Sequence, residues 1–278
     1  MKHLAWTLIA TLLAGPVALA QGTTGMPPAK DPPPPTTPTA MSDKNKEMLD
    51  GYLAAWERRM AKLEGLETKI VLTEIEDDHK IVRTGDAALL KPNYARMLLK
   101  LADDPTNAKK WKHFSADGKF LREYDYVKKV AWTSVLPKEG IGDNTLMSFL
   151  FMTSVADFKK RYDLSIDVDD PKRFTDHYLF IEIRPKTKED MQDFKKAELV
   201  LWKNNKDEKY FDRWMLPARL WFQQPNGNQI KWEFQNLSTQ KKLLPRDFEA
   251  PSFPDKEWKP DWLKPPTPSV IRTSAPSK

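Results

Sequence analysis

Short segments in which apolar and polar residues alternate dominate the middle of the chain. This period of two predicts strands, because successive side chains of a strand point to opposite faces of the sheet. Leu179, Ile181 and Ile183 share one face of such a segment, and Ile230, Trp232 and Phe234 share one face of another. The predicted strands are Leu66 to Ile75, Lys80 to Leu90, Tyr94 to Leu101, Trp111 to Ala116, Lys119 to Tyr126, Lys128 to Val135, His177 to Arg184, Ala197 to Trp202, Leu220 to Phe222 and Ile230 to Gln235.

Together these segments predict a large antiparallel sheet with one apolar face. Two turn signals support hairpins within it. Asp117-Gly118 and Asn226-Gly227 are both two-residue sequences typical of tight hairpin loops.

Helical spacing is found in three places. Apolar residues recur every three or four positions between Met48 and Leu63, with Ser42 or Asp43 as the expected cap and Gly65 as the stop. A second helix is expected over Val155 to Tyr162, and one or two helical turns over Thr187 to Phe194.

A further helical segment is apolar almost all round. It contains Leu146, Met147, Phe149, Leu150, Phe151 and Met152. One interpretation is an ordinary core helix, since a helix that is hydrophobic on every side is normally buried. The other is a lid over an apolar cavity, and the flexible thioethers of Met147 and Met152 suit a changing partner. The sequence leaves both interpretations open.

Composition divides the chain into four parts. Residues 1–20 match a secretory signal peptide, with an apolar run of about 10 residues that is too short to span a bilayer. Residues 21–42 and 255–278 are proline-rich and are expected to be disordered linkers, and residues 43–254 form one domain. The expected location is the periplasm or cell envelope.

Charge and chemistry exclude several classes of function. The net charge of +6 is spread along the chain without a basic stripe among stacking aromatics, so no nucleic-acid partner is expected. The chain has no cysteine, and His79, His113 and His177 lack metal-ligand spacing. Asp77-Asp78 and Asp169-Asp170 fit solvated loops better than a catalytic pair. No cofactor, metal or catalytic residue is therefore expected.

Tryptophans raise the question of sugar binding. Trp56, Trp132 and Trp232 occupy apolar positions of periodic segments and are expected in the core. Trp202, Trp214 and Trp221 fall on the polar side or at the edges, and they are the candidates for stacking on a ligand.

A series of short turn-like sequences resembles one family in order and spacing. The series is Gly85-Asp86, Lys91-Pro92-Asn93, Asp117-Gly118-Lys119, Tyr124-Asp125, Pro185-Lys186, Asn226-Gly227 and Asp247-Phe248-Glu249-Ala250-Pro251. It is similar to that of the periplasmic lipoprotein carrier (LolA-like) family, from about Met48 to about Pro254. The resemblance implies a mainly β fold, a half-open antiparallel barrel with an N-terminal helix, an apolar lid helix and a cavity for acyl chains. Where that family has an arginine before the proline, this chain has Lys91, a point charge without the planar fork of arginine.

The sequence therefore predicts an exported, non-enzymatic, monomeric protein that binds a lipid or the acyl chains of a lipoprotein. Contact with the membrane or envelope is expected to be transient at most. The expected ligand-binding residues are Lys91, Leu146, Met147, Phe149, Leu150, Phe151 and Met152. Two alternatives stay open: an envelope interaction module whose cavity is filled by its own side chains, and a hydrolase or carbohydrate binder.

Overall fold

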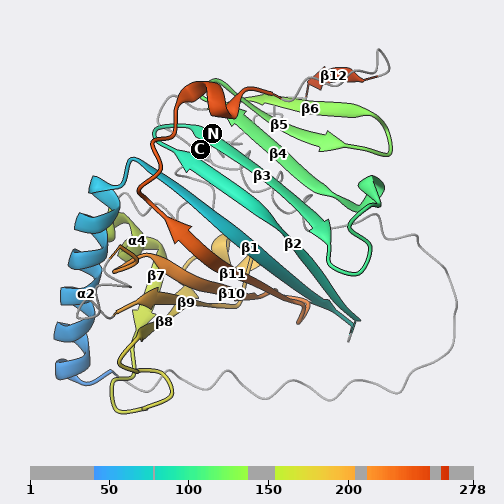
Figure 1. Cartoon of the computed structure of the whole chain (residues 1–278). Coiled ribbons are helices and arrows are strands. Elements are labelled where there is room, and N and C mark those ends of the chain that lie inside the picture. Colours follow the sequence, from blue (N-terminus) through green and yellow to red (C-terminus); the bar gives the residue numbers. More distant parts are fainter. Residues whose placement is uncertain (1–40, 78, 137–153, 204–211, 251–257, 263–278) are drawn as a thin grey trace, which may run out of the picture.

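A single curved sheet forms the body of the molecule (Figure 1). The computed structural model describes residues 41–77, 79–136, 154–203, 212–250 and 258–262. Within them the strands are β1 (Gly65–Glu76), β2 (His79–Leu90), β3 (Tyr94–Leu101), β4 (Lys112–Asp117), β5 (Phe120–Asp125), β6 (Val130–Val135), β7 (Tyr162–Ser165), β8 (Tyr178–Pro185), β9 (Lys196–Trp202), β10 (Pro217–Gln223), β11 (Gln229–Ser238) and β12 (Lys259–Trp262).

The strand order is β12-β6-β5-β4-β3-β2-β1-β11-β10-β9-β8-β7, so β1 pairs with both β2 and β11 near the middle of the sheet. All neighbours are antiparallel except β12, which runs parallel to β6. The sheet has two ends, β12 and β7, and does not close on itself. The predicted half-open antiparallel β-barrel is confirmed.

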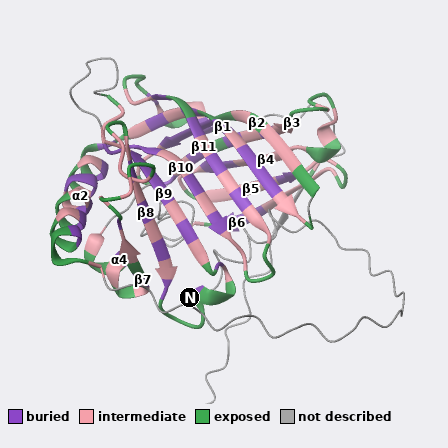
Figure 2. Cartoon of the chain, turned by 90° about the horizontal axis from the view of Figure 1, so that it is seen from below, coloured by how far each residue is buried: buried purple, intermediate pink, exposed green. Residues whose placement is uncertain are grey.

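The register gives the sheet one consistent inner face. Ile70 of β1 lies opposite Gly85 of β2 and Phe234 of β11, and directly paired residues point to the same side. Leu199 and Ile181 continue this face on β9 and β8. Figure 2 shows the result as alternating buried and less buried bands along the strands, as the period of two predicts.

Helix α2 (Asp43–Lys62) stands beside one end of the strands (Figure 1). Ser42 caps its start, since the Ser42 hydroxyl accepts a hydrogen bond from the backbone N–H of Asn45 at 3.3 Å. The helix buries Leu53, Trp56 and Met60, each with 0% exposure. This is the apolar face that the sequence predicts.

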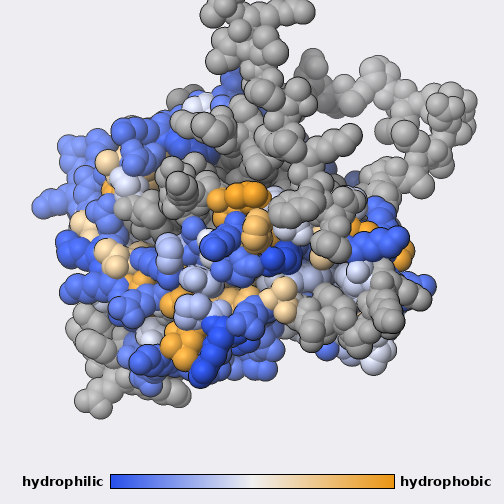
Figure 3. Space-filling view, turned by 90° about the horizontal axis from the view of Figure 1, so that it is seen from above, coloured by the Kyte–Doolittle hydropathy of each residue, from blue (hydrophilic) through white to orange (hydrophobic). Residues whose placement is uncertain are grey.

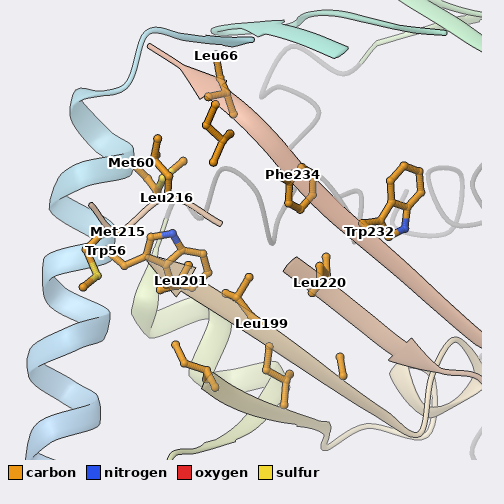
Figure 4. Packing of buried hydrophobic residues seen from close by; sticks show 14 of the residues in the cluster. Trp56, Met60, Leu66, Leu199, Leu201, Met215, Leu216, Leu220, Trp232 and Phe234 are labelled. Atoms are coloured by element: carbon orange, nitrogen blue, oxygen red, sulfur yellow. The ribbon is translucent and has the colours of Figure 1, made fainter. Parts of the chain in front are cut away.

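The core lies between α2 and the β7–β11 part of the inner face. Figure 4 shows Trp56 and Met60 pointing towards Leu201, Met215 and Leu216. The short helix α4 (Val155–Arg161) adds Phe158, whose ring meets that of Trp56 edge to face at 6.1 Å. Burial at this end of the sheet is complete.

Short 3-10 helices fill some of the connections, and they are η1 (Ala108–Lys110), η3 (Asp190–Gln192) and η4 (Pro245–Phe248). Phe248 of η4 packs with Ala88 and Leu243 in a small second cluster outside the main core. The helical turn expected within Thr187 to Phe194 is the one that η3 provides.

Three local predictions need correction. Helix α4 ends at Arg161, and Tyr162 begins β7 because its buried ring faces the core like its partner Pro185. The hairpin loop between β4 and β5 is Gly118-Lys119, and Asp117 is the last residue of β4. The carboxylate of Asp117 accepts hydrogen bonds from the backbone N–H groups of Lys119 and Phe120. Finally, Lys259–Trp262 form β12, although the sequence places them in the disordered tail.

Candidate ligand-binding site

The side chains on the inner face of the sheet are more deeply buried in one half of the sheet than in the other. Next to α2 its side chains are fully buried, whereas on β4, β5 and β6 the inner residues Phe114, Leu121 and Trp132 are only half-buried. Phe114 and Leu121 still pack against the main core. The described helices α2 and α4 pack on each other and on β7, and Figure 1 shows β4 to β6 lying away from α2.

One row of paired residues crosses this half of the sheet. It runs from Met97 on β3 to Phe114, then to Glu123 on β5 and Trp132 on β6. Three of the four are large apolar side chains, and the fourth is a carboxyl group. The inner face here is thus an apolar surface with a polar residue set into it.

A buried group of charged residues lies on the inner face, at the end of the apolar surface that is further from α2. Glu74 lies on β1 in phase with Leu72, and its side chain is only 4% exposed. Its carboxylate is paired with the guanidinium of Arg83 and with the ammonium of Lys112, whose Nζ lies 2.5 Å from Glu74 Oε1. Burial lowers the pKa of Lys112, and the charges of Glu74 and Glu76 partly counter this.

Glu123 lies on the same inner face, one strand beyond Lys112. Burial raises the pKa of Glu123 to about 7, while Lys112 lowers the pKa and Asp125 raises it further. Within the described part of the chain no hydrogen bond or ion pair reaches its carboxyl group. Near neutral pH a large fraction of Glu123 is therefore protonated.

Sequence reasoning missed this charged group. The sequence does contain a local signal for it. Three charged residues occupy strand positions whose side chains point to the same face as the apolar residues Leu72 and Leu99, and they are Glu74, Arg83 and Lys112. These three residues meet only because β1, β2, β3 and β4 pair in one register. A local sequence pattern does not contain that pairing.

Lys91, the predicted residue at the mouth, follows the last residue of β2. Its ammonium donates a hydrogen bond to the carbonyl of Met60 at 2.5 Å, and its backbone N–H donates to the carbonyl of Glu64 at 2.8 Å. Burial lowers the pKa of Lys91. The side chain thus caps the C-terminal end of α2, where the helix dipole favours a cation. The other predicted ligand-binding residues, Leu146 to Met152, lie outside the described residues.

The outer face of β4 to β6 carries an aromatic cluster that the sequence analysis did not anticipate. His113 stacks on Tyr124 with ring centroids 4.4 Å apart, and its Nδ1 is 2.7 Å from the hydroxyl of Tyr126. Burial lowers the pKa of His113 to about 4, so the imidazole is neutral at neutral pH. Trp258 packs against Tyr126 at 5.2 Å and leads into β12.

The remaining residues considered in the sequence analysis are the tryptophans and the possible metal ligands. Trp56 and Trp232 are buried as predicted, whereas Trp132 is half-buried. Trp202 and Trp214 pack against the main core. Within the described ranges, no group of three or more His, Cys, Asp or Glu side chains is placed to hold a metal ion.

Large exposed hydrophobic side chains are few among the described residues. Figure 3 shows mostly hydrophilic side chains on one face, with small separate hydrophobic patches. Among the described residues the large hydrophobic side chains that are exposed are Val127, Val135 and Met191. No helix in the described part of the chain is both long enough and apolar enough to cross a membrane.

No protein-family model matches the sequence, and no curated protein matches it either. Solved structures do resemble the fold. A LolA superfamily protein from Nitrosomonas europaea aligns over 72% of this chain and 97% of its own, with 10% identity and a TM-score of 0.39. A conserved protein from Thermus thermophilus aligns over 77% and 99%, with 9% identity and a TM-score of 0.44. LprF from Mycobacterium bovis aligns over 69% and 94%, with 10% identity and a TM-score of 0.36.

Proposed function

We propose that this chain is an exported, non-enzymatic protein that holds a lipid or an acyl chain against the inner face of its sheet. The observation that carries the proposal is the half-buried apolar surface of Phe114, Leu121 and Trp132 on β4 to β6. Large apolar side chains on the inner face of an open sheet favour an apolar occupant. An acyl chain placed there gains about 0.8 kcal/mol for each methylene group removed from water.

The apolar stretch 146–152 follows β6 in the chain, and in this proposal it contributes further apolar surface to the occupant. Lys91 stands at the α2 end of the same face, where a cation can meet polar groups at the mouth. Export follows from the signal-like residues 1–20, and the bound lipid then belongs to the cell envelope. The cargo of a lipoprotein carrier is one form that such a lipid can take.

A probe-binding experiment tests this proposal. Phe114→Ser and Leu121→Ser are each expected to weaken binding of a fluorescent fatty-acid probe about tenfold, because a hydroxyl replaces apolar contact surface. Phe149→Ser and Leu150→Ser are expected to act in the same direction. Val127→Ser is the matched control, since Val127 is 64% exposed in the turn between β5 and β6, and it is expected to leave affinity unchanged.

The same variants test the main alternative. If the inner face is filled by the protein's own side chains, the substitutions create cavities and unpaired polar groups in a core and cost about 2–5 kcal/mol of stability. A large fall in melting temperature together with unchanged probe affinity per folded molecule contradicts the proposal.

The second candidate function is an envelope interaction module with a self-filled interior. It is favoured by the complete burial of Trp56, Leu53 and Met60 between α2 and the sheet, which leaves this end of the interior fully occupied. In that case the proline-rich ends provide the contacts with partners.

A further inference from the structure

The charged group on the inner face has a definite position relative to α2. Leu72 of β1 pairs with Arg83 of β2, and Glu74 lies two residues further along β1, away from the end that α2 covers. On β3, Leu99 pairs with Lys112 of β4. The inner face is therefore apolar towards α2 and charged at its other end, which is the polarity of a site for an amphiphile.

The ion pairs in this group join two cations to one anion. Glu74 contributes one negative charge, while Arg83 and Lys112 contribute two positive charges. Glu76 also acts on Lys112, but it forms no ion pair with Lys112 among the described residues. The side chains of Arg83 and Lys112 are only 13% and 14% exposed, and an uncompensated charge in such surroundings is unfavourable. Glu123 of β5 lies on the inner face as well, and its raised pKa means that it supplies only part of a negative charge near neutral pH.

Arg83 and Lys112 also have N–H groups that donate no hydrogen bond to the described residues. The Nε–H of Arg83 is buried, and it has no hydrogen-bond partner among the described residues. The ammonium of Lys112 has three N–H groups, and among the described residues it donates one hydrogen bond, to Glu74. A carboxylate is an acceptor-only group with two oxygens and one negative charge, so it matches both the surplus charge and the unused donors.

We propose that Arg83 and Lys112 bind the carboxylate of a fatty acid, whose hydrocarbon chain lies against the half-buried apolar surface of Phe114 and Leu121. This assignment rests on the proposed lipid-binding function and narrows it to acidic, single-chain amphiphiles. A protonated Glu123 adds an O–H donor beside the same head group. The ordinary alternative is an ion group that only stabilises the sheet, and it predicts no preference between charged and neutral ligands.

Competition for a bound fluorescent probe, using the full chain stripped of lipid, separates the two. Oleate and methyl oleate have the same hydrocarbon chain, but only oleate has a charged head group. We expect oleate to displace the probe at least about tenfold more effectively than methyl oleate. Lys112→Met should reduce this ratio to about one while leaving the affinity for methyl oleate unchanged, and Lys112→Arg should retain the ratio.

Lys69→Met is the matched control, because Lys69 stands on β1 with an exposed side chain on the opposite face, and it should keep the wild-type ratio. If Lys112→Met does not fold, Arg83→Gln removes the same charge and should abolish the same preference. Equal displacement by the two ligands in the wild type overturns the head-group assignment alone. A preference that persists in both variants overturns it as well. Failure of both ligands to displace the probe contradicts the proposed function and this inference together.

Discussion

Glu74→Gln is expected to lower the free energy of unfolding by about 3–5 kcal/mol, because it removes the anion that pairs with two buried cations in the described part of the chain. The carboxylate of Glu74 holds Arg83 and Lys112 at a site where all three side chains are almost fully buried. A neutral amide keeps the shape of the side chain but deprives the two buried cations of the carboxylate that pairs with both. Urea denaturation of the wild type and the variant measures the difference.

The same strand provides a matched control. Glu67 also lies on β1 between two cations, at 3.2 Å from Arg96 and 3.0 Å from Lys241, but the side chains of these partners are 46% and 60% exposed. Water screens such pairs, so Glu67→Gln is expected to cost less than about 1 kcal/mol. Equal losses of stability in the two variants would show that burial of the Glu74 group has no energetic consequence.

Gly85→Ala is expected to cost about 3 kcal/mol or more, since there is no room for a side chain at this position. A Cβ atom on Gly85 would lie 1.8 Å from the carbonyl oxygen of Leu98 on the neighbouring strand β3. The obstacle is backbone, so β2 and β3 would have to separate where they form the middle of the inner face. The measurement is again the free energy of unfolding in urea.

Gly51→Ala is the control for this substitution. Gly51 is an exposed residue in the middle of α2, and a Cβ atom there meets nothing within 4 Å. Because alanine is the better helix former, the variant is expected to gain about 0.5–1 kcal/mol. Comparable stability changes for the two glycines would contradict the close approach of β2 and β3.

Most of the sheet could be predicted from the sequence because one buried face imposes a period of two. The alternation of Leu179, Ile181 and Ile183 gave both a strand and the side that faces inwards. Helix α2 was equally clear, since its cap and its apolar spacing agree. These elements are determined by residues close together in the chain.

The two missed strands depend on distant partners. β12 contains Pro260 and has no alternating pattern, yet it pairs with β6 as a parallel edge strand, where proline is tolerated. β7 has only four residues and follows α4 without a break. Neither has a local signal strong enough to separate it from its surroundings.

The candidate site also contains one part that local sequence predicts and one part that depends on distant residues. The apolar surface around Phe114 and Leu121 follows from the alternation, whereas the meeting of Glu74, Arg83 and Lys112 depends on the register of neighbouring strands. Lys91 is a predicted site residue because the family that the sequence resembles has an arginine before this proline, but the hydrogen bond from Lys91 to Met60 joins residues 31 positions apart. Long-range contacts of this kind cannot be predicted from a single sequence.

Native mass spectrometry of the protein purified from its own cell envelope tests the central claim most directly. The account predicts a complex of one chain with a lipid or fatty acid, which dissociates to the mass of the free chain on collisional activation. Extraction with organic solvent should remove this ligand, and added oleate should restore a complex. A chain that leaves the envelope without any bound lipid, and that takes up none when oleate or a phospholipid is added, would contradict the claim that the inner face binds an apolar ligand.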